Sequence, residues 1–233
     1  MKELIEQGRR SFMKEKQNEP IGDDSKVFDK IHWYRETSEG FLIESSGVVI
    51  PRDHLADSAY GVLDPATGKR RASNLGDFSC ILTGFKDLKG RLLVHSDWTK
   101  REPPTKYIKQ IFMNHEEYSY QKFGVEENLY RELLMPNLAD ERARQDERRK
   151  SLTKLGLYEI NQTKNKIERI TAIEPKVTHG WILFNRSLSQ EFVNQVLNFP
   201  GQHDDGPDCL EMLWNLVYNR YKVSSLSLNV FDR

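Results

Sequence analysis

The apolar residues of this chain fall into short runs, and the order of those runs is the strongest constraint on the fold. Three runs of strand length lie close together, at residues 60–64, 78–85 and 91–98. A Pro-Ala-Thr-Gly turn and a basic loop separate the first two, and residues 87–90 form a turn before the third. Apolar runs bounded by turn residues in this way are typical of strands in hairpins. The pattern therefore predicts two consecutive hairpins.

Helical and extended patterns alternate after these hairpins. Pro103-Pro104 precedes apolar residues at helical spacing, among them Tyr107, Ile108 and Ile111. We expect further strands at 118–125, 157–160 and 180–184, of which the strand at 157–160 would belong to an inserted hairpin. We expect helices at 163–173 and 188–199, and a last helix that begins between 204 and 208 and runs to 217. A meander of strands followed by alternating helices and strands predicts an α/β fold, in which a mixed central sheet carries helices on both faces.

The first 55 residues have a weaker pattern. A helix over 2–16 would end at Asn18, Pro20 and Gly22, and only short extended pieces follow, at 28–33 and 47–50. The 233 residues are enough for one sizeable core with a smaller appendage. We therefore expect a linker or approach segment over residues 1–55 and one domain over 56–233.

Composition excludes several classes of protein. The 35 basic and 35 acidic side chains give a formal net charge of zero, so any nucleic-acid partner must be held by local charge. Cys80 and Cys209 form no Cys-x-x-Cys pair, which argues against zinc and favours a reducing, cytosolic setting. The first residues lack an apolar signal core, and no apolar run approaches the roughly 20 residues that cross a bilayer. We expect no membrane partner.

Acidic residues stand at the ends of apolar segments. Asp64 ends the first strand, Glu126 ends the fourth, and Asp204, Asp205 and Asp208 open the last helix. Ligand sites in open α/β sheets gather where strand ends meet, so we expect these acids to converge. Each also has a local explanation: Asp64 can start a turn, Glu126 a helix, and Asp204 or Asp205 can cap the last helix.

Converging carboxylates repel one another unless a cation lies between them. Hard oxygen ligands favour Mg²⁺ or Mn²⁺ over zinc or copper. Two such ions about 4 Å apart can activate a water and stabilise the leaving oxygen of a phosphodiester. The acids therefore predict a site for Mg²⁺ or Mn²⁺.

The order of several motifs resembles one known family, the C-terminal nuclease domain of the large terminase subunit of tailed phages. The resemblance spans roughly residues 55–220. It rests on LDPATG at 63–68 with GDFS at 76–79, on 92–103 with Asp97, Trp98 and Arg101, on GVEEN at 124–128, on KNKIERI at 164–170 with Pro175, Gly180 and Phe184, and on FPGQHDDGPD at 199–208. FMKEKQNEP at 12–20 resembles the linker that follows the motor domain. Gly206-Pro207 departs from the family, which more often has aliphatic residues there.

The resemblance implies a ribonuclease H-like sheet with a two-metal carboxylate centre. Asp64 would bridge both ions, Glu126 would bind one ion and Asp205 the other. Asp204, Asp208 and Asp77 are further candidate ligands, and Asp204 can replace Asp205 as the direct ligand. His203 could steer phosphate or water, but a structural role is expected for it.

Basic residues near these acids are candidates for DNA contact. They lie in the loop after Asp64 and before the last acidic cluster: Lys69, Arg70, Arg71, Lys164, Lys166 and Arg169. Such residues would bind phosphates rather than bases, so binding would be salt-sensitive and weakly sequence-specific. The alternative for each of these residues is that it belongs to a solvated surface and makes no contact with DNA. Trp98, Trp181 and Trp214 are expected in the core.

The implied activity is metal-dependent cleavage of concatemeric double-stranded viral DNA during genome packaging. The chain has no Gly-x-x-x-x-Gly-Lys-Ser/Thr P-loop, and Ala66 to Lys69 do not supply one. We therefore expect the ATPase motor to be absent, either excised or on another chain. The expected partners are double-stranded DNA, the portal, the small terminase subunit and an ATPase motor domain, in the cytoplasm of an infected bacterial host. The alternatives are a non-catalytic module that docks on DNA or the portal, and a resolvase- or transposase-like nuclease.

Overall fold

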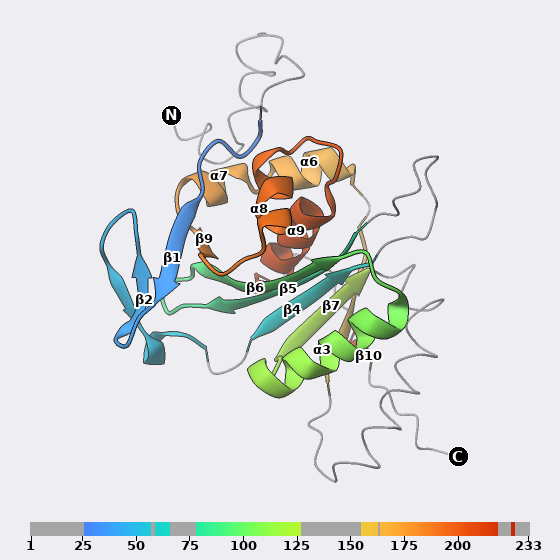
Figure 1. Ribbon diagram of the computed structural model, residues 1–233, viewed down its shortest axis with the longest axis horizontal. Coiled ribbons are helices and arrows are strands. Elements are labelled where there is room, and N and C mark those ends of the chain that lie inside the picture. The colour runs from blue at the N-terminus through green and yellow to red at the C-terminus, as the bar shows by residue number, and fades with distance from the viewer. Residues whose placement is uncertain are drawn as a thin grey trace.

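A computed structural model describes residues 26–56, 59–65, 78–126, 155–162, 164–218 and 225–226. Within these residues the chain forms a ten-stranded mixed sheet in the order β10-β8-β7-β4-β5-β6-β9-β1-β2-β3 (Figure 1). The sheet is therefore built from strands that lie far apart in the sequence. None of the described helices is long and apolar enough to cross a membrane.

The centre of the sheet is the predicted meander. β4 (Tyr60–Asp64) pairs antiparallel with β5 (Ser79–Lys86), and β5 pairs antiparallel with β6 (Leu92–Lys100). The last pair of β4 and β5 in register is Asp64 with Cys80, so Asp64 lies beside the start of β5. The two hairpins expected from the turn residues are confirmed.

Parallel strands extend the sheet on the β4 side. β7 (Lys122–Glu126) pairs parallel with β4, and β8 (Leu157–Ile160) pairs parallel with β7. β10 (Ser225–Leu226) pairs antiparallel with β8 at the edge. The expectation of an inserted hairpin at residues 157–160 was wrong, because β8 continues the parallel part of the central sheet.

The other end of the sheet uses residues that we expected to be a linker. β9 (Ile182–Asn185) pairs parallel with β6, and β1 (His32–Glu36) pairs parallel with β9. β2 (Gly40–Ile43) and β3 (Val49–Pro51) complete this end, before the short helix η2 (Arg52–His54). The sheet thus crosses the boundary placed at residue 55, so the described part of 1–55 is sheet and core rather than a linker.

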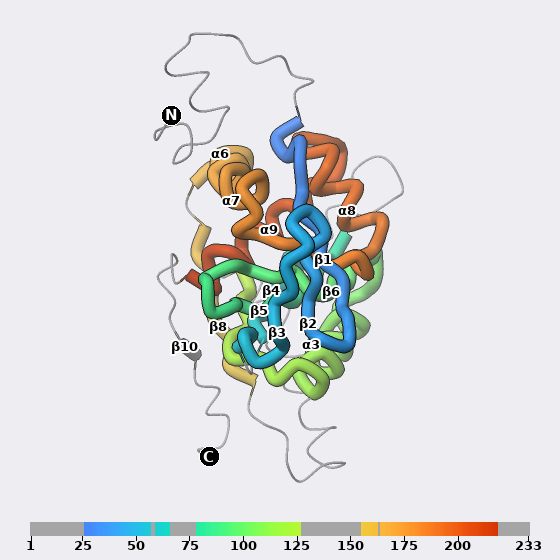
Figure 2. The backbone as a smooth tube through the Cα atoms, turned by 90° about the vertical axis from the view of Figure 1, so that its left-hand side faces the viewer, coloured from blue at the N-terminus to red at the C-terminus, as the bar shows by residue number. Residues whose placement is uncertain are grey.

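Helices cover both faces of the sheet, as predicted. α3 (Pro104–Tyr118) lies on one face. The other face carries α6 (Lys166–Thr171), α7 (Glu174–Thr178), α8 (Gln190–Leu197) and α9 (Asp205–Val217), and Figure 2 shows this group from the side. Successive strand residues point to opposite faces. Leu63 and Ile81 accordingly pack in the cluster with α3, whereas Val62 and Leu82 pack in the cluster with α9.

Strand direction brings the candidate acids to one edge. β4 and β7 are parallel neighbours, so their carboxyl ends, Asp64 and Glu126, lie at the same edge of the sheet. α9 packs on β4 and β5, and its N-terminus carries Asp205 and Asp208. The fold therefore delivers acids from three distant segments to one place.

A substitution at Gly61 on β4 would test how tightly the sheet packs on the face covered by α3. A Cβ there would lie 2.5 Å from Phe123 Cδ2 and 2.7 Å from Tyr120 Cε1. We expect Gly61→Ala to lower the free energy of unfolding by about 1–3 kcal/mol, because two buried rings must shift. The measurement is urea denaturation followed by circular dichroism.

Gly156→Ala is the matched control for that measurement. The nearest atom to a Cβ at Gly156 is Tyr158 Cε2 at 3.5 Å, an ordinary contact. Its effect should stay within about 0.5 kcal/mol. Equal effects of the two substitutions would contradict the packing described for β4.

Candidate metal-binding site

A cavity of about 500 Å³ opens at the edge where β4 and β7 end. Its polar lining combines acidic and basic side chains. The acids are Asp64, Glu126, Asp204, Asp205 and Asp208, and the basic side chains are Lys164, Lys166, Arg169 and His203. The five described acids predicted from the sequence therefore line one cavity, together with the three described basic residues predicted to bind DNA.

Asp64 is one of the two buried acids of this cavity lining, with Asp208. Only 8% of the residue is exposed, and its Oδ2 has no hydrogen-bond partner among the described residues. Burial raises the pKa of Asp64 well above its ordinary value, and Asp208 raises it further. Lys166 acts in the opposite direction but does not cancel the shift. An ionised Asp64 therefore needs a cation beside it.

Glu126 approaches the cavity from the neighbouring strand. Burial raises the pKa of Glu126, and the carboxylate of Asp208 adds to the rise, while Arg169 and Lys166 oppose it. Asp208 thus acts on both strand-end acids. The acids of β4, β7 and α9 therefore interact electrostatically with one another.

The N-terminus of α9 is fixed to the rest of the molecule by two contacts. The Cys209 thiol lies 3.3 Å from the backbone carbonyl of Cys80 and donates to it. The amide N–H of Gly206 donates to Gln195 Oε1 on α8 at 2.8 Å. A Cβ on Gly206 would lie 3.1 Å from that oxygen, so a glycine suits this close approach. These contacts hold Asp205 and Asp208 over the ends of β4 and β5.

The Asp204 side chain does not cap α9, although the sequence allowed that role. Asp204 occupies the N-cap position of α9, but its side chain makes no capping hydrogen bond. Its Oδ1 instead lies 2.8 Å from Lys166 Nζ. The carboxylate therefore faces a cation of α6 rather than the backbone of its own helix.

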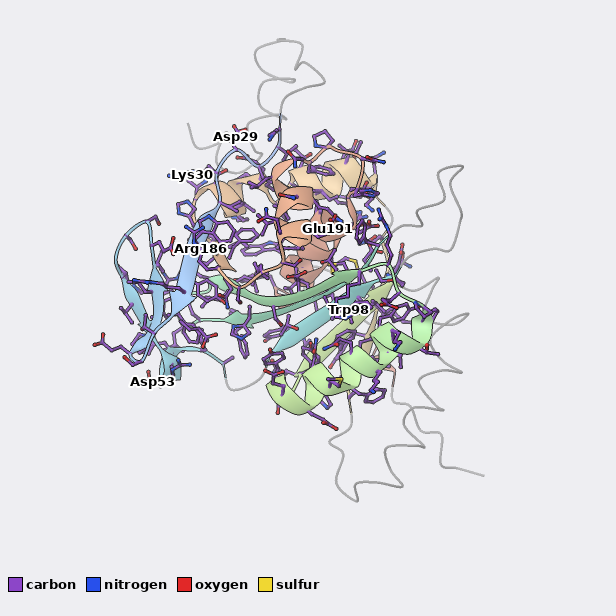
Figure 3. All side chains as sticks on the ribbon, in the orientation of Figure 1. Asp29, Lys30, Asp53, Trp98, Arg186 and Glu191 are labelled. Atoms are coloured by element: carbon purple, nitrogen blue, oxygen red, sulfur yellow. The ribbon has the colours of Figure 1, made fainter. Side chains whose placement is uncertain are left out.

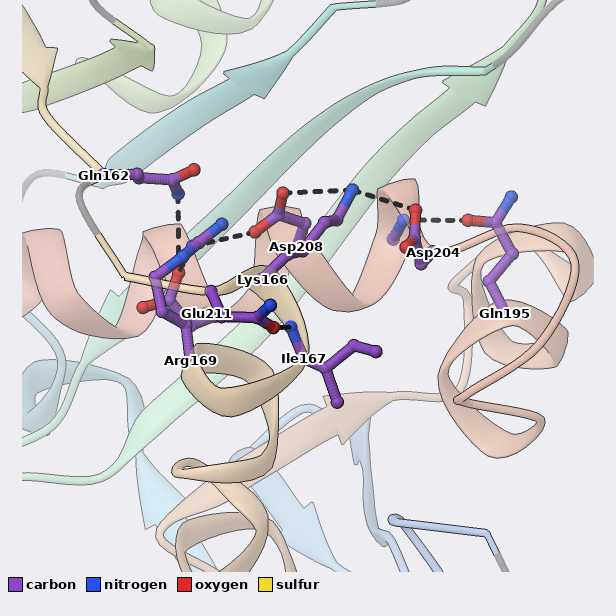
Figure 4. Close-up of polar contacts among 10 residues, drawn as sticks. Gln162, Lys166, Ile167, Arg169, Gln195, Asp204, Asp208 and Glu211 are labelled. Atoms are coloured by element: carbon purple, nitrogen blue, oxygen red, sulfur yellow. Dashed lines mark hydrogen bonds and ion pairs between the residues drawn. The ribbon is translucent and has the colours of Figure 1, made fainter. Parts of the chain in front are cut away.

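α6 presents two cations to the first turns of α9, as Figure 4 shows. Asn165 Oδ1 accepts from the Ile167 amide at 2.9 Å, which starts α6 at Lys166. Lys166 and Arg169 are three residues apart and therefore share a helix face. Lys166 Nζ lies 3.1 Å from Asp208 Oδ2, and Arg169 Nη1 lies 2.9 Å from Asp208 Oδ1. Asp208 is thus held from both sides.

The two cations differ in their surroundings. The Arg169 side chain is 8% exposed and also pairs with the buried Glu211. The Lys166 side chain is 35% exposed. Burial alone would lower the pKa of Lys166, but Asp64, Asp208 and Asp204 raise it overall, so this amine stays protonated. In this structure both residues, predicted to contact DNA, bind carboxylates.

The rim of the cavity contains Arg101, for which the sequence predicted no role at the site. Arg101 lies over the Phe78 ring at 4.0 Å, and its Nη2 is 3.3 Å from His203 Nε2. The rings of Phe78 and His203 meet edge to face at 5.2 Å. His203 therefore has a packing role, as expected. Arg101 places a further positive charge at this rim.

The donor set suits a hard divalent cation, because it offers carboxylate oxygens and one buried, unpartnered oxygen of Asp64. Within the described ranges, no three acidic, histidine or cysteine groups are already placed to hold an ion. Asp208 is instead engaged by Lys166 and Arg169. Asp77, Lys69, Arg70 and Arg71 lie outside the described residues, and the roles given to them stay predictions.

Comparison with known proteins first defines the class of fold. No known family model matches the chain, and no curated protein matches it in sequence. Solved structures do match, and the mixed sheet with helices on both faces is the ribonuclease H-like fold expected from the sequence.

The large terminase of bacteriophage HK97 matches with a TM-score of 0.50 and 9% identity, over 70% of this chain and 40% of that one. The human cytomegalovirus terminase nuclease domain, soaked with Mn and bound to an inhibitor, matches with a TM-score of 0.49 and 12% identity, over 74% and 90% of the two chains. A yeast mitochondrial Holliday junction resolvase matches with a TM-score of 0.44 and 13% identity, over 72% and 85%. At these identities the likeness is one of fold.

Asp64→Asn should stabilise the metal-free protein. The folded state raises the pKa of Asp64 above its unfolded value, so the stability it contributes is present at low pH and is lost as pH rises through the folded pKa. At neutral pH a neutral isostere should raise the free energy of unfolding by about 1 kcal/mol, and stability should fall less steeply with rising pH. Urea denaturation with a chelator present, between mildly acidic and neutral pH, measures both effects.

Asp53→Asn is the control for this measurement. Asp53 is an exposed acid of η2, beyond the β3 end of the sheet (Figure 3). Its substitution should leave the pH profile unchanged. If Asp64→Asn proved neutral or destabilising at neutral pH, the buried carboxylate would not carry the repulsion described.

Proposed function

We propose that this protein is a divalent-metal-dependent DNA endonuclease that cuts concatemeric double-stranded viral DNA during genome packaging. The observation that carries the proposal is the shared cavity, in which the buried acid at the end of β4 meets acids of β7 and α9. Carboxylates brought together at this burial are typical of cation sites rather than of stabilising structure. The likeness of fold to a phage large terminase supports the same reading.

Asp64, Glu126 and Asp205 are the proposed catalytic acids. Asp64 would contact both of two Mg²⁺ or Mn²⁺ ions, Glu126 one of them and Asp205 the other. Asp204, Asp208 and Asp77 are further candidate ligands. Bound ions would supply an activated water and stabilisation of the leaving oxygen. The carboxylates would hold the ions, because strand ends and a packed helix fix the positions of these side chains.

Basic groups around the cavity would hold the DNA backbone. Lys164, Lys166 and Arg169 line the cavity, and Arg101 lies at its rim. Lys69, Arg70 and Arg71 would add contacts from the loop after Asp64. Phosphate contacts position DNA without reading its sequence, so binding should weaken steeply with salt.

The proposed setting is a viral packaging machine in the cytoplasm of an infected bacterium. The motifs that resemble phage terminases favour this setting, and the missing P-loop means that translocation would need an ATPase motor on another chain or another part of a longer one. The portal and the small terminase subunit are the corresponding proposed partners.

Plasmid cleavage tests the activity. The wild-type protein should nick or linearise supercoiled plasmid in Mn²⁺ or Mg²⁺ and be inactive with a chelator. Asp64→Asn should lower the cleavage rate by about a thousandfold or more, because it removes the central acid. The readout is gel electrophoresis over time, with circular dichroism to show that the fold is intact.

The same assay, a cation-binding titration and a comparison of branched with linear DNA separate the alternatives. Asp53→Asn removes an acid remote from the cavity and should cut like the wild type. Cleavage by Asp64→Asn at the wild-type rate would exclude the proposed centre. A wild-type protein that binds no divalent cation at millimolar concentration would favour the non-catalytic docking module, and strong preference for branched over linear duplex would favour a resolvase-like enzyme.

A further inference from the structure

Lys166 occupies a central position among the acids of the cavity. Its Nζ lies 2.8 Å from Asp204 Oδ1 and 3.1 Å from Asp208 Oδ2, as drawn in Figure 4. It also interacts electrostatically with Asp64, the buried acid at the end of β4. One ammonium group therefore contacts two carboxylates and acts on a third.

The position of Lys166 bears directly on metal binding. An oxygen that accepts a charge-assisted hydrogen bond from an ammonium is not available in the same direction to a cation. The positive charge of Lys166 also repels an ion that approaches Asp64. The described acids that line the cavity include no group of three ready to hold an ion, while Lys166 and Arg169 engage Asp208.

Lys166 is the more movable of the two cations. Arg169 is buried and also pairs with Glu211, so it is fixed in the core of the α6–α9 contact. Lys166 is 35% exposed and carries its charge on a flexible four-carbon stem. A rotamer change can carry its ammonium toward solvent without moving either helix.

We propose that Lys166 is a built-in counter-ion, which neutralises the acidic cavity in the metal-free protein and must leave Asp204 and Asp208 before a divalent cation binds tightly. This inference rests on the proposed function, since it assumes that the acids receive such an ion. It assigns Lys166 a role in metal affinity, separate from the DNA contact expected for it. Lys166 therefore lowers the intrinsic metal affinity of the free protein.

The proposal predicts opposite changes in two properties on loss of the Lys166 charge. Lys166→Met should lower the melting temperature of the metal-free protein by a few degrees, because the repulsion among Asp64, Asp204 and Asp208 is then offset only by Arg169 at Asp208. The same substitution should tighten Mn²⁺ binding on the order of tenfold, because the competitor is gone. A residue that only orients Asp208 for the ion would show weaker Mn²⁺ binding when removed.

Isothermal titration with Mn²⁺ alone, and thermal unfolding with a chelator, measure the two properties on the full chain. Lys166→Arg keeps the positive charge and should bind Mn²⁺ within about threefold of the wild type. Lys166→Gln keeps a hydrogen-bond donor without the charge and should bind more tightly, which provides a second variant if the methionine form does not fold. Lys109→Met, on the exposed side of α3, makes the same change in net charge and should alter neither property.

The outcomes separate this inference from the proposed function. Tighter Mn²⁺ binding by both neutral variants, with a less stable metal-free protein, supports the inference. Mn²⁺ binding by the wild type with unchanged or weaker binding by Lys166→Met and Lys166→Gln overturns the inference alone. No Mn²⁺ binding by the wild type or by either neutral variant overturns the inference and the proposed function together.

Discussion

Repulsion between carboxylates at one sheet edge is the constraint around which the rest of the structure is arranged. Asp64 is buried, its pKa is raised, and Asp208 contributes to that rise from another element. Two groups of contacts keep the acids in place despite this repulsion. α9 is fixed by its bonds to Cys80 and Gln195, and α6 supplies the positive charges of Lys166 and Arg169. Charge pairs as well as apolar contacts therefore stabilise the packing of helices on this face.

Local pattern was enough to predict the centre of the fold. The turn residues at 87–90 and the apolar runs around them predicted β4, β5 and β6, since hairpins depend on neighbouring segments. The proline pair predicted the start of α3. Acids at strand ends predicted the cavity, because parallel strands such as β4 and β7 place their carboxyl ends at one edge.

Features that depend on distant pairing were missed. β1 is stabilised by β9, which lies far along the chain, so nothing in its own short sequence distinguishes it from a linker. β8 was assigned to a hairpin for the same reason. Trp181 was expected in the core but is 44% exposed, whereas Trp214 is buried. An apolar neighbourhood in sequence does not fix which side of a turn faces solvent.

The basic residues of α6 show why charge patterns are ambiguous. Lys166 and Arg169 have the spacing of a phosphate-binding face, but their partners are the acids of α9, about forty positions later. The signal that could have revealed this is the matched spacing of Asp208 and Glu211, which also lie three residues apart on one helix. Two helix faces with opposite charges at the same residue spacing can pair with each other. The sequence of one helix alone does not show such a pairing.

The order of the acids along the chain has a consequence for the synthesis of the protein. Among the described acids that line the cavity, the first in the chain lies on β4, and α9, which completes the cavity, is the last described helix. A ribosome therefore makes most of the sheet before the helix that closes it emerges. Contacts of such high sequence separation form late in folding. A nascent chain would hold the strand-end acids without their partners, so the cavity would be assembled only when translation of this region ends.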